Sequence, residues 1–286
     1  MIPSAFEYVA PTTVEEAVQA LAEAGEDAKV LGGGQSLVPV LRLRLAAPTA
    51  IIDLSRISEL RGVREDGDAI VIGAMTTHHD VLNDPLVAQH AELLAAATRT
   101  VGDPQIRHRG TFGGALVHAD PAGDLLAPAV AMDAEMVIAG PDGRRTVPAS
   151  EFFTTLFTTA VGADEVLVEI RVPKKTGWGA HYEKFNRVAQ AWSIVAVAAT
   201  VRTEGGSIAE ARVALTNMGA TPIRATAVEE ALVGQQAGAE SIRAAAQHAA
   251  EGTSPMSDGN ADADYREHLA RVLTGRAVAT AAGVGG

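Results

Sequence analysis

KVLGGGQS, residues 29–36, is the stretch of sequence that decides how this chain folds. The segment at 29–31 predicts a strand, Gly32, Gly33 and Gly34 a turn, and residues 37–43 a helix that Ser36 can cap. Glycine lets a ligand approach the backbone closely, and neighbouring N–H groups turned to one side bind an anion. Strand, glycines and helix in this order favour a phosphate site. Taken alone, the loop is equally compatible with a structural turn, because it completes neither the Rossmann nor the Walker A pattern.

A second glycine loop, RGTFGG, occupies residues 109–114 and follows a polar, turn-rich stretch over 102–110. Like the first loop it contains a hydroxyl residue, Thr111, close to Gly113 and Gly114. Two such loops predict a ligand whose pyrophosphate is held from both sides, which is a dinucleotide cofactor. Asp124 opens an apolar helical pattern over 124–132. It has two interpretations, the N-cap of that helix or a carboxylate that holds a polar part of the cofactor.

The whole chain divides into three sections of mixed helix and strand, which is an α+β arrangement. Residues 1–57 are predicted to hold a helix at 13–24 and strands at 29–31 and 50–53. The section 58–175 is predicted to hold helices near 77–82, 88–97 and 124–132 and strands near 62–64, 69–73, 136–139, 145–147 and 165–172. The section 176–286 is predicted to hold three strands at 180–185, 194–202 and 208–215, and then helices at 225–232, 241–250 and 265–276.

Composition argues against several classes of function. The 286 residues carry a formal net charge of −12 and a pI near 5.1, which disfavours a general nucleic-acid binder. The sequence has no cysteine, so this chain cannot itself ligate an iron–sulfur cluster through thiolates or use a cysteine nucleophile. We recognise no signal peptide and no apolar run long enough for a membrane span, and we expect a cytoplasmic protein.

The histidines carry no recognisable pattern of a metal or catalytic site. His78 and His79 are adjacent, and adjacent side chains on a helix point in different directions. His118 with Asp120 adds no metal-ligand spacing, so we predict no metal site.

Beyond the two loops, further segments follow the pattern of one family. These are LRLR at 41–44, DPAGD at 120–124, YEKFNR at 182–187 and NMGATPIRA at 217–225. Over nearly its whole length the chain resembles the FAD-binding medium subunit of molybdenum hydroxylases. That family includes aerobic carbon monoxide dehydrogenase and the FAD domain of xanthine dehydrogenase.

The resemblance implies a fold and a cofactor. The fold would be the vanillyl-alcohol-oxidase (PCMH) type, in which lobes 1–57 and 58–175 clasp FAD, followed by a third domain of three strands and a helical bundle at 176–286. Gly32 to Ser36, Gln35 included, would bind the pyrophosphate from one side through backbone N–H groups, and Thr111 to Gly114 from the other. Asp124, Leu167 and Lys184 match positions that contact the cofactor, and Trp192 falls near an aromatic that stacks by the isoalloxazine.

The resemblance also implies the partners and the reaction. A large subunit would hold molybdenum and the substrate, a small subunit two [2Fe–2S] clusters, and the assembly would be a dimer of heterotrimers. Electrons would pass from the clusters through FAD to an external acceptor. No side-chain acid or base of this chain would be indispensable. Two departures from the family pattern stand out. Ala115 replaces Asn or Asp in the second loop. In the first loop, Gln35 replaces the His of carbon monoxide dehydrogenases and Val38–Val40 replaces a segment that is often Met-rich in them, which disfavours carbon monoxide as substrate.

Two other functions remain open from the sequence. One is a stand-alone flavin oxidase of the same fold, which needs a base over the flavin and often a covalent link through His or Cys. The other is a non-catalytic nucleotide-binding or scaffold protein, which would leave the purified chain colourless in the presence of FAD.

Overall fold

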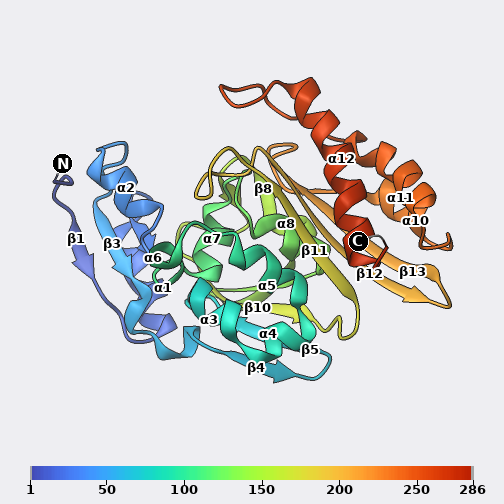
Figure 1. Cartoon of the computed structure of the whole chain (residues 1–286). Helices are drawn as coiled ribbons and strands as arrows, with labels where there is room; N and C mark the ends of the chain where they lie inside the picture. The colour runs from blue at the N-terminus through green and yellow to red at the C-terminus, as the bar shows by residue number, and fades with distance from the viewer. Residues whose placement is uncertain (1, 285–286) are drawn as a thin grey trace.

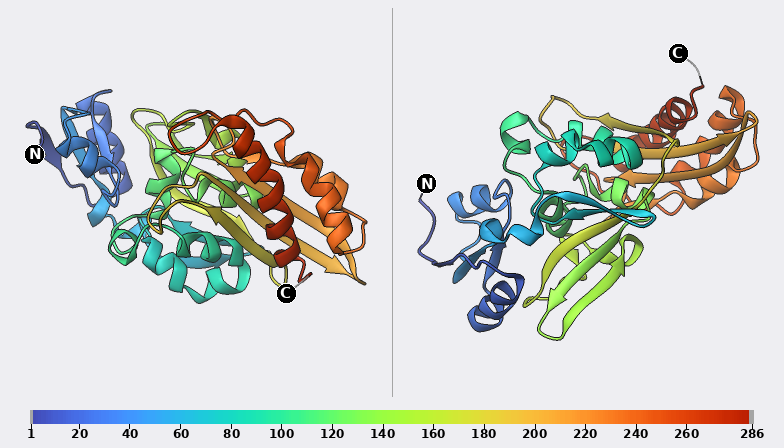
Figure 2. Two further views of the ribbon diagram at one scale, coloured as in Figure 1. Left: turned by 45° about the horizontal axis from the view of Figure 1, so that its top comes forward. Right: turned by 90° about the horizontal axis from the view of Figure 1, so that it is seen from below.

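The computed structural model describes residues 2–284. Three sheets of three or more strands follow one another along the chain, each with its own helices, and a two-stranded sheet accompanies the middle one (Figure 1). The views from other sides show the N-terminal sheet beside the middle one and the C-terminal sheet on the opposite side of the middle (Figure 2). None of the helices in residues 2–284 combines the length and apolarity that a membrane span needs.

The first sheet is small and parallel, in the order β1-β3-β2. Its strands are β1 (Glu7–Val9), β2 (Lys29–Leu31) and β3 (Ala50–Asp53). The helix α1 (Val14–Ala24) joins β1 to β2, α2 (Leu37–Arg42) joins β2 to β3, and the turns η1 (Leu54–Arg56) and η2 (Ser58–Leu60) follow. The predicted elements of this lobe are present. The strand β1 escaped prediction because its three residues show no apolar alternation.

The second sheet is antiparallel, in the order β4-β5-β10-β6-β7. Its strands are β4 (Val63–Asp66), β5 (Ala69–Gly73), β6 (Glu135–Gly140), β7 (Gly143–Pro148) and β10 (Val166–Pro173). The helices of this section are α3 (His78–Asn83), α4 (Pro85–His90), α5 (Glu92–Arg99), α6 (Pro104–Arg107), α7 (Phe112–His118), α8 (Leu126–Ala131) and α9 (Ala149–Phe152). A short hairpin joins β8 (Phe153–Thr155) to β9 (Thr158–Thr159).

Two helix predictions in this section need correction. The helix expected at 88–97 is broken at Ala91, whose ψ of 48° interrupts the helical path between α4 and α5. The helix expected from Asp124 begins only at Leu126, with Leu125 as its N-cap residue. The N-cap interpretation of Asp124 is therefore wrong, and its carboxylate has other partners, described below.

The third sheet is antiparallel and has four strands rather than the predicted three. The strands β11 (Gly179–Phe185), β12 (Val195–Glu204) and β13 (Ser207–Thr216) match the prediction, and β14 (Ile223–Arg224) adds two residues at the edge. This strand is too short for its side-chain pattern to signal it. The helices are α10 (Thr226–Leu232), α11 (Ala239–Ala246), η3 (Gln247–Ala250) and α12 (Ala263–Ala281), and they share one core with this sheet.

The second and third sections share buried apolar side chains. Tyr182, Ala196, Ala198 and Ala214 of the third sheet belong to the same core cluster as α5 and α8. The two faces of the third sheet therefore pack on different partners, the middle section on one side and its own helices on the other. This shared core fixes the position of the C-terminal section relative to the middle one.

Candidate functional site

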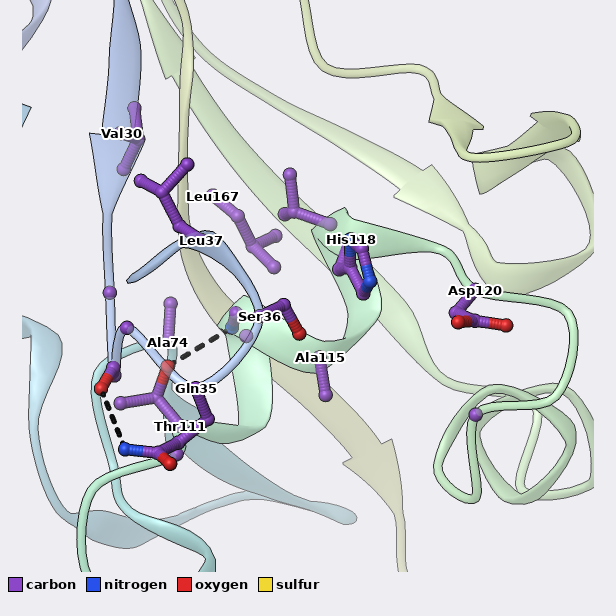
Figure 3. Close-up of a pocket in the computed structure, with 18 of the residues that line it drawn as sticks. Val30, Gln35, Ser36, Leu37, Ala74, Thr111, Ala115, His118, Asp120 and Leu167 are labelled. Carbon is purple, nitrogen blue, oxygen red and sulfur yellow. Dashed lines mark hydrogen bonds between the residues drawn. The ribbon is translucent and has the colours of Figure 1, made fainter. Parts of the chain in front are cut away.

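A cavity of about 770 Å³ lies between the three sections. Its lining includes every cofactor-binding residue predicted from the sequence: Gly32, Gly33, Gly34, Gln35, Ser36, Thr111, Gly113, Gly114, Asp124, Leu167, Lys184 and Trp192. Figure 3 shows the two glycine loops at one end, with Leu167, His118 and Asp120 farther along. Residues spread over most of the chain thus converge on one hollow. A cavity of this volume with a few convergent polar groups is typical of a small-molecule site.

The first glycine loop presents unused hydrogen-bond donors to this cavity. Within residues 2–284, the backbone N–H groups of Gly33, Gly34, Gln35 and Ser36 have no protein acceptor. Gly34 has a φ of +76°, a backbone conformation that glycine adopts without strain. The predicted capping role of Ser36 needs correction, because its side chain accepts no hydrogen bond from α2 in the described structure. A row of free N–H groups at a cavity wall can bind an anion.

The second glycine loop uses its donors within the protein. The N–H of Phe112 donates to the Thr76 carbonyl at 2.9 Å, and that of Gly113 donates to the Ala74 carbonyl at 2.9 Å. The N–H of Gly114 donates to Thr111 Oγ1 at 3.2 Å, so Thr111 caps α7. The structure therefore differs from the expectation that Gly113 and Gly114 offer their N–H groups to a pyrophosphate. Thr111, which lines the cavity, keeps two donors: its hydroxyl hydrogen and its backbone N–H, which has no protein acceptor in residues 2–284.

The two loops are in direct contact. A Cβ on Gly33 would lie 2.2 Å from the Arg109 carbonyl oxygen and 2.5 Å from Gly110 Cα. A Cβ on Gly32 would lie 3.1 Å from Thr111 Oγ1. The first loop can therefore approach the second only because it lacks side chains. The second loop supports the first from behind, and the first offers the free donors.

At another part of the cavity, Asp124 is the centre of a buried polar cluster. Its carboxylate accepts hydrogen bonds from Tyr182 Oη at 2.9 Å and Ser193 Oγ at 2.9 Å, and lies 2.8 Å from Lys184 Nζ. Asp124 is 8% exposed. Burial raises the pKa of Asp124, and the Lys184 charge opposes that shift. The cluster ties the loop before α8 to β11 and to the start of β12.

The segment over residues 186–194 forms the rim beside this cluster. Trp192 lines the cavity and leaves 56% of its surface exposed, which is unusual for a large aromatic side chain. Gln190 donates from Nε2 to Asp103 Oδ2 at 2.9 Å and so links this segment to the loop before the second glycine loop. The other tryptophan, Trp178, does not line the cavity. The Lys175 ammonium lies 4.5 Å from the centre of its ring.

Sequence reasoning missed several other lining residues. His78 is 4% exposed, its Nδ1 has no partner among the described residues, and burial and the Arg107 charge lower its pKa to about 4. His118 packs its ring 5.4 Å from that of Phe157 at the tip of the β8–β9 hairpin. Within residues 2–284 no group of three or more potential ligands is placed to hold a metal ion. The buried run of β5 just before His78 was the available sign that this histidine is not on the surface.

Two models of known protein families match this chain. A family model described as the FAD binding domain in molybdopterin dehydrogenase matches residues 4–175. A second, described as the CO dehydrogenase flavoprotein C-terminal domain, matches residues 180–281. The chain belongs to the FAD-binding medium subunits of molybdenum hydroxylases. The resemblance seen in the sequence is thereby confirmed, and this medium subunit is the FAD-binding part of an oxidoreductase.

Individual relatives cover this medium subunit almost end to end. It is 43% identical over 281 residues to the carbon monoxide dehydrogenase medium chain of Hydrogenophaga pseudoflava, which covers 97% of each chain. It is 35% identical over 286 residues to caffeine dehydrogenase subunit beta of Pseudomonas sp. (strain CBB1), covering 99% of this chain and 96% of that one. It matches the crystal structure of quinoline 2-oxidoreductase from Pseudomonas putida 86 with a TM-score of 0.94, at 33% identity and 99% coverage of both chains.

These relatives are named for chemically unrelated compounds although their chains align from end to end with this one. The donors present fit FAD. Free N–H groups at Gly33–Ser36 suit a pyrophosphate, and the cavity continues from them to the Asp124–Lys184 pair.

Proposed function

We propose that this medium subunit holds FAD in the cavity between its three sections and relays electrons from [2Fe–2S] clusters of a partner subunit to an external acceptor. The observation that carries the proposal is the row of free N–H groups at Gly33–Ser36, in a loop that lines a cavity of about 770 Å³. When bound, FAD supplies the capacity to accept electrons singly and to release one or two of them.

The side chains of this subunit would bind and orient the cofactor. The first glycine loop would hold the pyrophosphate by its N–H groups, and Thr111 would add its hydroxyl from the second loop. Leu167 on β10 would form an apolar wall, and Trp192 would cover the ring system at the rim. Lys184 lies 2.8 Å from Asp124 and opposes the rise that burial causes in its pKa, and this pair would hold a polar part of the cofactor.

We also propose the finer division of the fold. Residues 1–57 and 58–175 would be the two lobes of a vanillyl-alcohol-oxidase (PCMH) type FAD-binding fold, and residues 176–286 the third domain. Each of these ranges contains one of the sheets of three or more strands, which supports the division. The cavity, at the junction of the three, would then be a site that no single unit completes.

The proposed partner subunits would supply the cysteine ligands that this chain lacks. Iron–sulfur clusters need thiolate ligands, and the sequence has no cysteine, so the clusters would belong to a small partner subunit. A large subunit would hold molybdenum and the substrate, and the assembly would be a dimer of heterotrimers in the cytoplasm. The names of the relatives, which are medium chains or subunits of dehydrogenases, support an assembly of unlike chains.

The test removes FAD from the purified complex and follows its cofactors by absorbance under anaerobic conditions. We expect substrate to reduce the iron–sulfur clusters with or without FAD, and reduction of an external acceptor to require FAD and to return when FAD is added. A FAD-loaded chain that oxidises a substrate without its partners would establish a stand-alone oxidase instead. A chain that binds no FAD would support the scaffold.

A further inference from the structure

One buried charge in this subunit has no part in the site described so far. Arg266 is on α12, and its side chain is 2% exposed. Its Nη1 donates to the Ile194 carbonyl, its Nη2 lies 2.8 Å from Asp258 Oδ2, and its Nε has no partner in residues 2–284. A buried guanidinium with incomplete pairing costs stability, and an apolar side chain in its place would avoid that cost. Stability alone therefore does not explain an arginine at this position.

The carbonyl that Arg266 holds belongs to the rim of the cavity. Ile194 follows Trp192 and Ser193, and the Ser193 hydroxyl donates to Asp124 at 2.9 Å. Asn217 also binds this backbone: its Nδ2 donates to the Ser193 carbonyl at 2.8 Å and to the Ile194 carbonyl at 3.2 Å. Two side chains from separate elements thus fix the backbone at the end of the rim segment.

The partner of Arg266 is itself held in place. Asp258 accepts hydrogen bonds from the N–H groups of Asn260 at 2.8 Å and Ala261 at 3.1 Å. These hydrogen bonds, together with the Arg266 charge, lower the pKa of Asp258 to about 2, so the pair stays ionised at neutral pH. The connection therefore runs from the loop before α12, through Arg266, to the rim that carries Trp192.

We propose that Arg266 is a positioning residue, which holds the Ser193–Ile194 backbone and thereby orients Trp192 and the Ser193–Asp124 hydrogen bond at the flavin end of the cavity. The inference rests on the proposed function, because Trp192 and Asp124 must face the bound flavin for their orientation to matter. Arg266 is not itself among the residues that line the cavity, and its hydrogen bond is to the Ile194 carbonyl at the end of the rim segment, away from the pyrophosphate loop. Its removal should disturb the surroundings of the flavin ring more than retention of FAD.

The experiment compares whole complexes that contain wild-type subunit, Arg266→Met, Arg266→Lys or Asp258→Asn, with Arg271→Met as the control. Arg271 is a half-exposed arginine on the same helix, and it pairs only with Glu267 among the described residues. The readouts are FAD content, the visible circular dichroism of the bound flavin and its midpoint potential. The last two report the surroundings of the ring, which a purely structural role would leave unchanged in the folded fraction.

We expect Arg266→Met to change the flavin dichroism and potential while FAD affinity falls no more than about tenfold, the equivalent of one ordinary hydrogen bond. Arg266→Lys keeps a charge but cannot bridge both partners, and it should fall between Met and wild type. Asp258→Asn alters a half-exposed side chain and provides a folded test if Arg266→Met does not fold; it should shift the dichroism in the same direction, by less.

Wild-type dichroism and potential in Arg266→Lys and Asp258→Asn would overturn the inference, as would an equal shift in Arg271→Met. The proposed function fails by a different sign, namely a wild-type complex that contains no FAD or that reduces its acceptor without it. The two failures are therefore distinguishable.

Discussion

The two glycine loops have similar sequences, GGGQS and TFGG, yet their backbone N–H groups are used in opposite ways. The N–H groups of Gly33 to Ser36 have no protein acceptor in the described structure, whereas those of Phe112, Gly113 and Gly114 all donate within the protein. Both loops contain glycines with no room for a side chain, so the space around the glycines does not distinguish the loops. The loops differ in whether their backbone N–H groups have protein acceptors. A glycine-rich loop is a ligand site only where its donors are left free.

The largest effect is expected at Gly33, where the two loops meet. The change Gly33→Val places a branched side chain where a Cβ already lies 2.2 Å from the Arg109 carbonyl oxygen. Overpacking of this kind costs about 1–3 kcal/mol or more, so we expect the complex to retain less than about a tenth of its FAD. The measurement is flavin absorbance per protein. Gly259→Val is the control, because nothing lies within 4 Å of a Cβ there. Wild-type flavin content in Gly33→Val would refute the contact between the loops.

Acid should lower the stability of the protein through His78, which lies beneath the second glycine loop. The backbone N–H of His78 donates to the Gly110 carbonyl, and the His78 ring lies where a Gly110 side chain would be. Burial lowers the pKa of His78 to about 4, below the value of about 6.5 in the unfolded chain. Between those values the unfolded state binds a proton that the folded state does not, so stability is present above pH 6.5 and is lost as pH falls. The loss from this one ring is at most about 3 kcal/mol.

Denaturant unfolding at several pH values measures this loss. The variant His78→Leu cannot titrate at this position, so its unfolding free energy should fall less steeply than that of the wild type between about pH 6.5 and 4. The difference between the two slopes isolates the ring from the carboxylates, which both proteins share. Identical slopes would show that His78 is not held neutral beneath the second loop.

A substitution in the second glycine loop should lower the stability of the protein rather than its affinity for FAD. In Gly113→Ala the new Cβ would lie 2.6 Å from Ala74 Cβ and 2.7 Å from its carbonyl oxygen, so the unfolding free energy should fall by about 1–3 kcal/mol. Gly275→Ala is the matched control within a helix. Its Cβ would meet Ala246 Cβ at an ordinary 3.7 Å, and the change should stabilise the chain by about 0.5–1 kcal/mol. A Gly113→Ala protein of normal stability that has lost FAD would place Gly113 at the cofactor after all.

The comparison of the loops also shows what the sequence could reveal. Local patterns predicted most helices and strands, because apolar spacing and turn residues are written in adjacent positions. The direction of the Gly113 N–H depends on Ala74, and the role of Asp124 depends on Lys184 and Ser193. These partners are distant in sequence, and no local pattern signals them. Part of the cavity lining, the two glycine loops above all, was therefore predictable, whereas His78, His118 and the hydrogen-bond partners of the lining residues were not.

The smallest effect separates the loops most cleanly, because it compares two hydroxyls at equivalent places. Thr111 Oγ1 accepts the Gly114 N–H, so Thr111→Ala should lower the unfolding free energy by about 1 kcal/mol, the usual value of an N-cap, and Thr111→Ser should restore it. Ser36 accepts no such bond from α2, so Ser36→Ala should change stability by no more than about 0.5 kcal/mol. Denaturant unfolding of the chain without FAD measures both. Equal losses would mean that Ser36 caps α2 as Thr111 caps α7, and that the first loop is no more open than the second.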